Sequence, residues 1–119
     1  MARILIIDDD KDLRVALRMM LEQGGHRVVE AENGADGVHI YSQNPTDLVI
    51  TDVMMPKQDG METLLELKSD FPDVKIIVIS GKDREFLPIA KEFGALHTLF
   101  KPFRQAELNE AIQSVLGTE

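Results

Sequence analysis

The chain contains no cysteine and has few basic residues relative to acidic ones. The absence of cysteine from its 119 residues excludes both disulfide bonds and thiol catalysis. There are 13 Lys and Arg residues against 21 Asp and Glu residues, and the formal net charge is -8. Direct nucleic-acid binding is not expected, because phosphate recognition needs clustered basic side chains. The acidity is compatible with a divalent cation or a basic protein surface as a partner.

Long apolar runs and a targeting segment are also missing. The longest apolar stretches fall far short of the roughly 20 residues that span a bilayer. The first residues run directly into a strand pattern rather than a signal peptide. A hydrophobic content of 44% supports a packed core, and no segment has a disordered composition. We therefore expect one soluble cytoplasmic domain over residues 1–119, without membrane insertion.

Apolar blocks alternate with amphipathic blocks along the whole chain. The apolar blocks predict strands at residues 3–7, 27–31, 48–51, 74–80 and 96–100. The amphipathic blocks predict helices at residues 11–23, 34–42, 60–69 and 104–116, and a short, late-starting helix within 86–93 because of Pro88. This alternation indicates an α/β fold: a doubly wound, five-stranded parallel sheet with helices on both faces.

Polar residues follow these strands where each strand ends. Asp8 and Asp9 follow the first strand, Asp52 follows the third, and Lys101 follows the fifth. Ser80 ends the fourth strand. Ligands bind at the carboxyl ends of the strands in such folds, so these residues predict a site.

Three neighbouring carboxylates must take up protons or bind a cation. Oxygen ligands in an open site suit Mg²⁺, and no residue set matches a zinc pattern. His26, His39 and His97 are isolated, and we expect each to be structural or exposed.

A carboxylate can also act as a nucleophile and form an acyl phosphate. Lys101 could then offset phosphoryl charge, and the Ser80 hydroxyl could bind a phosphoryl oxygen. The chain has no Walker loop or glycine-rich fingerprint, so a nucleotide is not expected as the donor.

Several segments together match a known family. They are residues 4–10 (ILIIDDD), 52–56 (DVMMP) with 59–60 (DG), 79–81 (ISG), 94–95 (GA) and 101–103 (KPF). Over nearly its whole length the chain resembles a bacterial two-component response-regulator receiver domain. The resemblance implies a flavodoxin-like (α/β)5 three-layer sandwich with strand order 2-1-3-4-5.

The resemblance also implies a role for each matching residue. Asp52 would be the phosphoacceptor and Lys101 would contact the phosphoryl group. Asp9 would bind Mg²⁺ directly and Asp8 through water, with Asp52 and the backbone carbonyl of Met54 as further ligands. Ser80 would be the switch hydroxyl, and the Lys101–Pro102 peptide would be cis.

The function so implied is a phosphorylation-dependent signalling switch rather than an enzyme. A sensor histidine kinase or histidine phosphotransfer protein would phosphorylate Asp52. The domain would catalyse only its own phosphorylation and slow dephosphorylation, and would then change its binding to an unknown downstream protein or output domain. No output segment follows the last predicted helix, which fits a stand-alone regulator or an excised domain.

Two other functions compete with this interpretation. Asp8 to Asp10 contain the Asp-x-Asp spacing of metal-dependent phosphohydrolases that form an aspartyl phosphate, although Asp52 would then have no role. A pseudo-receiver that only binds proteins is the third possibility, and the complete acid-and-lysine set argues against it. Asp10 itself is predicted to be a helix N-cap.

One position departs from the family pattern. Receivers usually carry Tyr, Phe or His three residues before the lysine, where this chain has Thr98. By strand alternation Phe100 faces the same side as Thr98, and His97 faces the other. We expect phosphorylation to move Ser80 and to be read through the following loop or the fourth helix.

Overall fold

The computed structural model describes residues 2–52, 60–81 and 85–117. There the elements follow in the order β1 (Arg3–Ile7), α1 (Lys11–Gln23), β2 (Arg27–Ala31), α2 (Gly34–Gln43), β3 (Leu48–Asp52), α3 (Gly60–Asp70), β4 (Ile76–Ser80), α4 (Phe86–Glu92), β5 (His97–Phe100) and α5 (Gln105–Leu116). These strands form one parallel sheet in the order β2-β1-β3-β4-β5. The predicted fold and strand order are confirmed.

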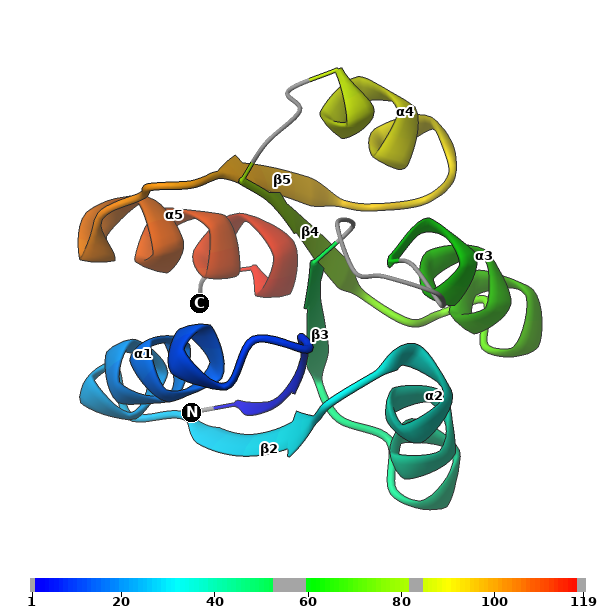
Figure 1. Cartoon of the computed structure of the whole chain (residues 1–119), viewed down its shortest axis with the longest axis horizontal. Helices are drawn as coiled ribbons and strands as arrows, with labels where there is room; N and C mark the ends of the chain where they lie inside the picture. Colours follow the sequence, from blue (N-terminus) through cyan, green and yellow to red (C-terminus); the bar gives the residue numbers. More distant parts are fainter. Residues whose placement is uncertain (1, 53–59, 82–84, 118–119) are drawn as a thin grey trace.

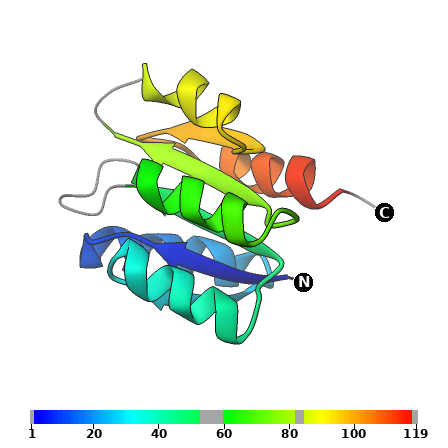
Figure 2. The ribbon, with the colours of Figure 1, turned by 90° about the vertical axis from the view of Figure 1, so that its right-hand side faces the viewer.

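The sheet is covered on both faces, as its apolar central strands require. Ile4 and Ile6 of β1 pack in one core cluster with apolar residues of α1 and α5. Leu5 and Ile7 point to the opposite face and pack with residues of α2, α3 and α4. Figure 1 shows α1 and α5 on one side of the sheet and α2 and α3 on the other. Figure 2 looks onto the side that α2 and α3 cover.

The buried faces of two helices include residues that are not hydrophobic, and both faces leave an alanine exposed. Ala16 of α1 is exposed, whereas Arg14 is buried because its guanidinium finds polar partners inside. In α2 the apolar residue Ala35 is exposed, and the buried stripe contains Gly34, Gly37 and Tyr41. Glycine carries no hydrophobic signal, so the pattern could not reveal this close-packed face.

The helix termini follow the sequence more closely. Asp10 is the N-cap of α1, and its Oδ1 accepts hydrogen bonds from the amides of Asp12 (3.0 Å) and Leu13 (3.3 Å). The helix α4 is short, as predicted, but it begins at Phe86, two residues before Pro88. Pro88 is tolerated there because amides in a first turn have no intrahelical acceptor. Among the residues that the structure describes, no helix is both long and apolar enough to cross a membrane.

Candidate functional site

The strand register places two of the predicted acids side by side. Ile7 of β1 pairs with Thr51 of β3, so the residues that follow them, Asp8 and Asp52, are neighbours at the carboxyl edge of the sheet. Both are buried, with 1% and 5% of their surfaces exposed. Two buried carboxylates at adjacent strand ends are costly unless positive charge compensates them.

The ionised form of Asp8 carries an electrostatic cost. Burial raises the pKa of Asp8 from its ordinary 3.8 to about 7, and the neighbouring carboxylate of Asp52 also raises it. The Asp10 amide, which donates to Asp8 Oδ1 at 2.8 Å, and the charge of Lys101 act in the opposite direction. The other oxygen, Oδ2, is buried and has no hydrogen-bond partner among the described residues.

Lys101 supplies the positive charge next to Asp52. Its Nζ donates to Asp52 Oδ2 at 2.8 Å, although β4 lies between their strands. Two strand spacings are about 10 Å, so the lysine must extend across the end of β4. Gly81 leaves room for it, because a Cβ there would lie 3.2 Å from both Cδ and Cε of Lys101. This glycine is a site residue to which sequence reasoning assigned no role.

Ser80 is the last residue of β4 and lies beside these groups. It is fully buried, and it pairs in register with Phe100 of β5. Its carbonyl accepts a hydrogen bond of 2.8 Å from the amide of Lys101. The predicted cis peptide between Lys101 and Pro102 is confirmed. Thr98 pairs with Val78 and is half-buried.

The donor set fits a hard divalent cation. Asp8 Oδ2 is a buried oxygen without a hydrogen-bond partner in residues 2–52, 60–81 and 85–117, and a second carboxylate, that of Asp52, lies beside it. Carboxylate oxygens without nitrogen or sulfur donors suit Mg²⁺, which keeps several waters and needs few protein ligands.

The predicted site residues are therefore only partly assembled in the described structure. Asp9 is exposed, and across residues 2–52, 60–81 and 85–117 no group of three or more Asp, Glu, His or Cys side chains could hold a metal ion. Met54, whose carbonyl was the further predicted ligand, lies outside the described residues. The structure thus brings together Asp8, Asp52 and Lys101, and the roles assigned to all of the predicted site residues stay predictions.

The three histidines lie apart from this site. His26 is half-buried, and its Nδ1 accepts a hydrogen bond of 3.1 Å from the amide of Ala2. Burial lowers the pKa of His26. His97 is half-buried on β5, where its Nδ1 lies 3.1 Å from the carbonyl of Thr98. His39 is exposed on α2. The expectation of structural or exposed histidines is consistent with these positions.

The sequence model of a protein family, the response regulator receiver domain, matches residues 4–113 of this chain. The chain belongs to this family. It is 38% identical over 120 residues to the protein PilH of Pseudomonas aeruginosa, covering 98% of this chain and 99% of PilH. It is also 38% identical to the chemotaxis protein CheY of Bacillus subtilis, covering 97% and 98% of the two chains.

A solved response regulator has the same fold. The response regulator TrrA from Thermotoga maritima, in complex with Mg²⁺ and BeF, is 30% identical with a TM-score of 0.89, covering 98% of this chain and 100% of that one. Other curated relatives are longer, and the chain spans 48–58% of their length. As a receiver domain, the chain is a phosphorylation-dependent signalling switch of a two-component system.

The competing functions are not favoured by these findings. Asp10, the second acid of the Asp-x-Asp spacing, uses its carboxylate to cap α1 rather than to face the site. Asp52, which had no role in a phosphohydrolase, lies next to both Asp8 and Lys101.

Proposed function

We propose that this receiver domain accepts a phosphoryl group on Asp52, and that a sensor histidine kinase or histidine phosphotransfer protein donates it. The observation that carries the proposal is the contact of 2.8 Å between Lys101 Nζ and Asp52 Oδ2 at a buried strand end. A buried nucleophilic carboxylate beside an ammonium is the arrangement that acyl-phosphate formation requires.

The transfer exchanges one bond to phosphorus for another. A carboxylate oxygen of Asp52 attacks the phosphorus of the phosphohistidine, and the phosphorus–nitrogen bond breaks with the electron pair going to the imidazole. Lys101 stays beside the acyl phosphate and offsets the charge of its oxygens. The Ser80 hydroxyl binds one phosphoryl oxygen, which couples phosphorylation to movement after β4. Water later hydrolyses the acyl phosphate slowly, so the domain acts as a switch rather than an enzyme for an external substrate.

Mg²⁺ is the cofactor that we propose for this transfer. The groups that would hold it are Asp8, Asp9, Asp52 and the Met54 carbonyl. The Oδ2 of Asp8, which has no hydrogen-bond partner among the residues that the structure describes, supports that assignment. When bound, Mg²⁺ supplies positive charge that offsets the equatorial phosphoryl oxygens.

Intact-mass measurement with a small phosphodonor and Mg²⁺ tests the role of Asp52. The wild type should gain one phosphate-sized mass increment, and Asp52→Asn should gain none, because an amide is not a competent nucleophile. Asp70→Asn is the matched control, since it removes an exposed acid from the far end of α3. The assignment would be wrong if Asp52→Asn gained phosphate as the wild type does.

Some receivers accept a phosphoryl group only from their kinase and not from a small phosphodonor. A second measurement therefore uses a phosphoryl mimic. Titration with beryllofluoride and Mg²⁺, followed by NMR of backbone amides, should shift the amides of Ser80 and Lys101 in the wild type. Asp52→Asn should show no such shifts. A wild type that neither gains mass with the phosphodonor nor shifts its amides with beryllofluoride would favour the pseudo-receiver interpretation.

A further inference from the structure

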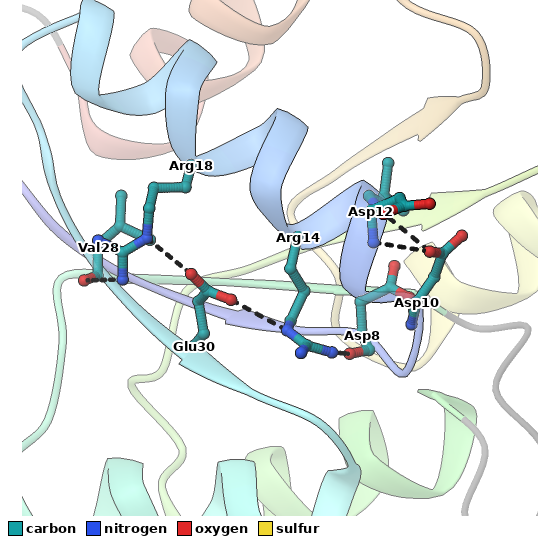
Figure 3. Close-up of polar contacts among 8 residues, drawn as sticks. Asp8, Asp10, Asp12, Arg14, Arg18, Val28 and Glu30 are labelled. Carbon is teal, nitrogen blue, oxygen red and sulfur yellow. Dashed lines mark hydrogen bonds and ion pairs between the residues drawn. The ribbon is translucent and has the colours of Figure 1, made fainter.

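Arg14 is a buried charged side chain that joins the site to the edge of the sheet. Only 8% of its surface is exposed. Its Nη1 donates to the backbone carbonyl of Asp8 at 2.7 Å, and its Nε donates to Glu30 Oε1 at 3.0 Å (Figure 3). A buried guanidinium is costly without such partners, so both contacts account for its place inside the fold.

Glu30 of β2 is itself held from a second direction. Arg18 Nε donates to Glu30 Oε2 at 2.6 Å, and Arg18 also contacts the Val28 carbonyl (3.2 Å) and Glu22 (3.0 Å). The hydrogen bond from Arg18 lowers the pKa of Glu30 below its usual range. Glu30 is therefore a fixed, charged acceptor. It fixes the orientation in which the guanidinium of Arg14 donates to both Glu30 and the Asp8 carbonyl.

The contact with the Asp8 carbonyl constrains the next residue as well. The carbonyl of Asp8 and the amide of Asp9 belong to one planar peptide, so fixing the carbonyl fixes the direction in which the chain enters Asp9. The amide of Asp10 in turn donates to Asp8 Oδ1 at 2.8 Å. The orientation of this one peptide thus bears on both Asp8 and Asp9.

We infer that Arg14, held by Glu30, is a positioning residue that orients the Asp8–Asp9 peptide for magnesium binding. This inference rests on the proposed function, since the site concerned is the one proposed to hold Mg²⁺. Arg14 touches neither the phosphoryl group nor the metal in this role, and acts through the backbone of Asp8.

A purely electrostatic role and a positioning role for Arg14 predict opposite changes in Mg²⁺ affinity when Arg14 is removed. If Arg14 acted only as a nearby positive charge, its removal would make the acidic site more attractive to a cation. If it positions the peptide, its removal should weaken Mg²⁺ binding, as the loss of outer-shell partners does in other metal sites. The sign of the change therefore separates the two roles.

The experiment compares Arg14→Met with Arg18→Met by isothermal titration of the purified protein with Mg²⁺. Both substitutions remove one arginine partner of Glu30, but only Arg14 contacts the Asp8 carbonyl. We expect Arg14→Met to bind Mg²⁺ about 10- to 100-fold more weakly. Arg18→Met should bind nearly as the wild type does.

Hydrogen exchange supplies a readout that needs no metal. In Arg14→Met the Asp10 amide should exchange faster relative to the amides of β1, because its acceptor on Asp8 is no longer held in place. In Arg18→Met that ratio should stay at its wild-type value. If Arg14→Met does not fold, Arg14→Lys replaces it, since one ammonium cannot reproduce the guanidinium fork and should weaken binding in the same direction.

Any of four results would overturn the inference. Unchanged or tighter Mg²⁺ binding by the Arg14 variant would reduce Arg14 to a structural or purely electrostatic role. Equal weakening in the Arg14 and Arg18 variants would assign the effect to general stability. A wild type that does not bind Mg²⁺ would refute the magnesium site as well. Wild-type binding that Asp8→Asn abolishes, together with normal binding by the Arg14 variant, would refute the positioning role alone.

Discussion

The ionised form of Asp8 is disfavoured where the folded chain places it. The side chain is buried beside Asp52, and its Oδ2 has no hydrogen-bond partner in the described part of the chain. The pKa of Asp8 rises to about 7 in the folded protein, against an ordinary value of 3.8. Between those two pH values the folded state binds more protons than the unfolded state, so rising pH destabilises the metal-free fold. Above pH 7 the whole penalty is present.

Asp8→Asn should therefore stabilise the metal-free protein, and more so at pH 8 than at pH 5. The substitution removes the buried charge, and each kcal/mol relieved raises the Tm of a domain of this size by roughly 3–6 °C. Thermal unfolding in the presence of a chelator measures the effect, with Asp9→Asn as the control because Asp9 is exposed. A Tm difference between Asp8→Asn and wild type that does not grow from pH 5 to pH 8 would contradict the raised pKa.

At the scale of elements, α2 packs on β1 so closely that Gly37 leaves no room for a side chain. A Cβ added at Gly37 would lie 2.4 Å from Cδ1 and 2.7 Å from Cγ1 of Ile7, which is fully buried. Ile7 is also the residue before Asp8, so the packing of α2 bears on the strand end that carries the site.

Gly37→Ala should lower the free energy of unfolding by about 1–3 kcal/mol, the usual cost of overpacking. The gain in helix propensity, about 1 kcal/mol, offsets only part of the clash. Chemical denaturation measures the change. Gly24→Ala is the control, because its Cβ would meet its nearest neighbours at an ordinary 3.4 Å. Adding Ile7→Val should recover part of the loss, and a double variant with strictly additive effects would show that this contact is not the cause.

At the scale of the whole molecule, the net charge of -8 opposes compaction. Any salt should relieve this repulsion by screening, whereas Mg²⁺ should add the linkage free energy of a specific site. That linkage amounts to about 2.7 kcal/mol at a free Mg²⁺ concentration 100 times the Kd.

MgCl₂ should therefore raise the Tm more than NaCl at equal ionic strength. The additional rise in Tm with MgCl₂ should largely disappear in Asp8→Asn. It should persist in Asp70→Asn, which removes the same charge from the exposed end of α3. Differential scanning calorimetry measures the comparison. An excess that both variants lose equally would indicate diffuse cation binding to the acidic surface instead of a site.

The local elements and the chemistry of the strand ends could be read from the sequence. Period and caps predicted the strands, and the helices other than α4, to within two residues. The strands were recognisable because apolar blocks of a covered parallel sheet have no polar alternation. The helix α4 was predicted to start late because of Pro88, but it begins at Phe86. The acids and the lysine could be recognised because a charge at the end of a buried apolar run is costly unless a partner compensates it. The family segments then supplied the strand order that periodicity alone cannot give.

Contacts between distant residues were decided by the tertiary structure. The register of β1 with β3 makes Asp8 a neighbour of Asp52, and Gly81 lets Lys101 cross the end of β4. Arg14 lies inside because Glu30 and the Asp8 carbonyl meet it there, which no hydrophobic pattern encodes. Periodicity reports how one element divides between core and water, whereas a site depends on which side chains of different elements meet, and that is fixed only when the sheet and its helices pack.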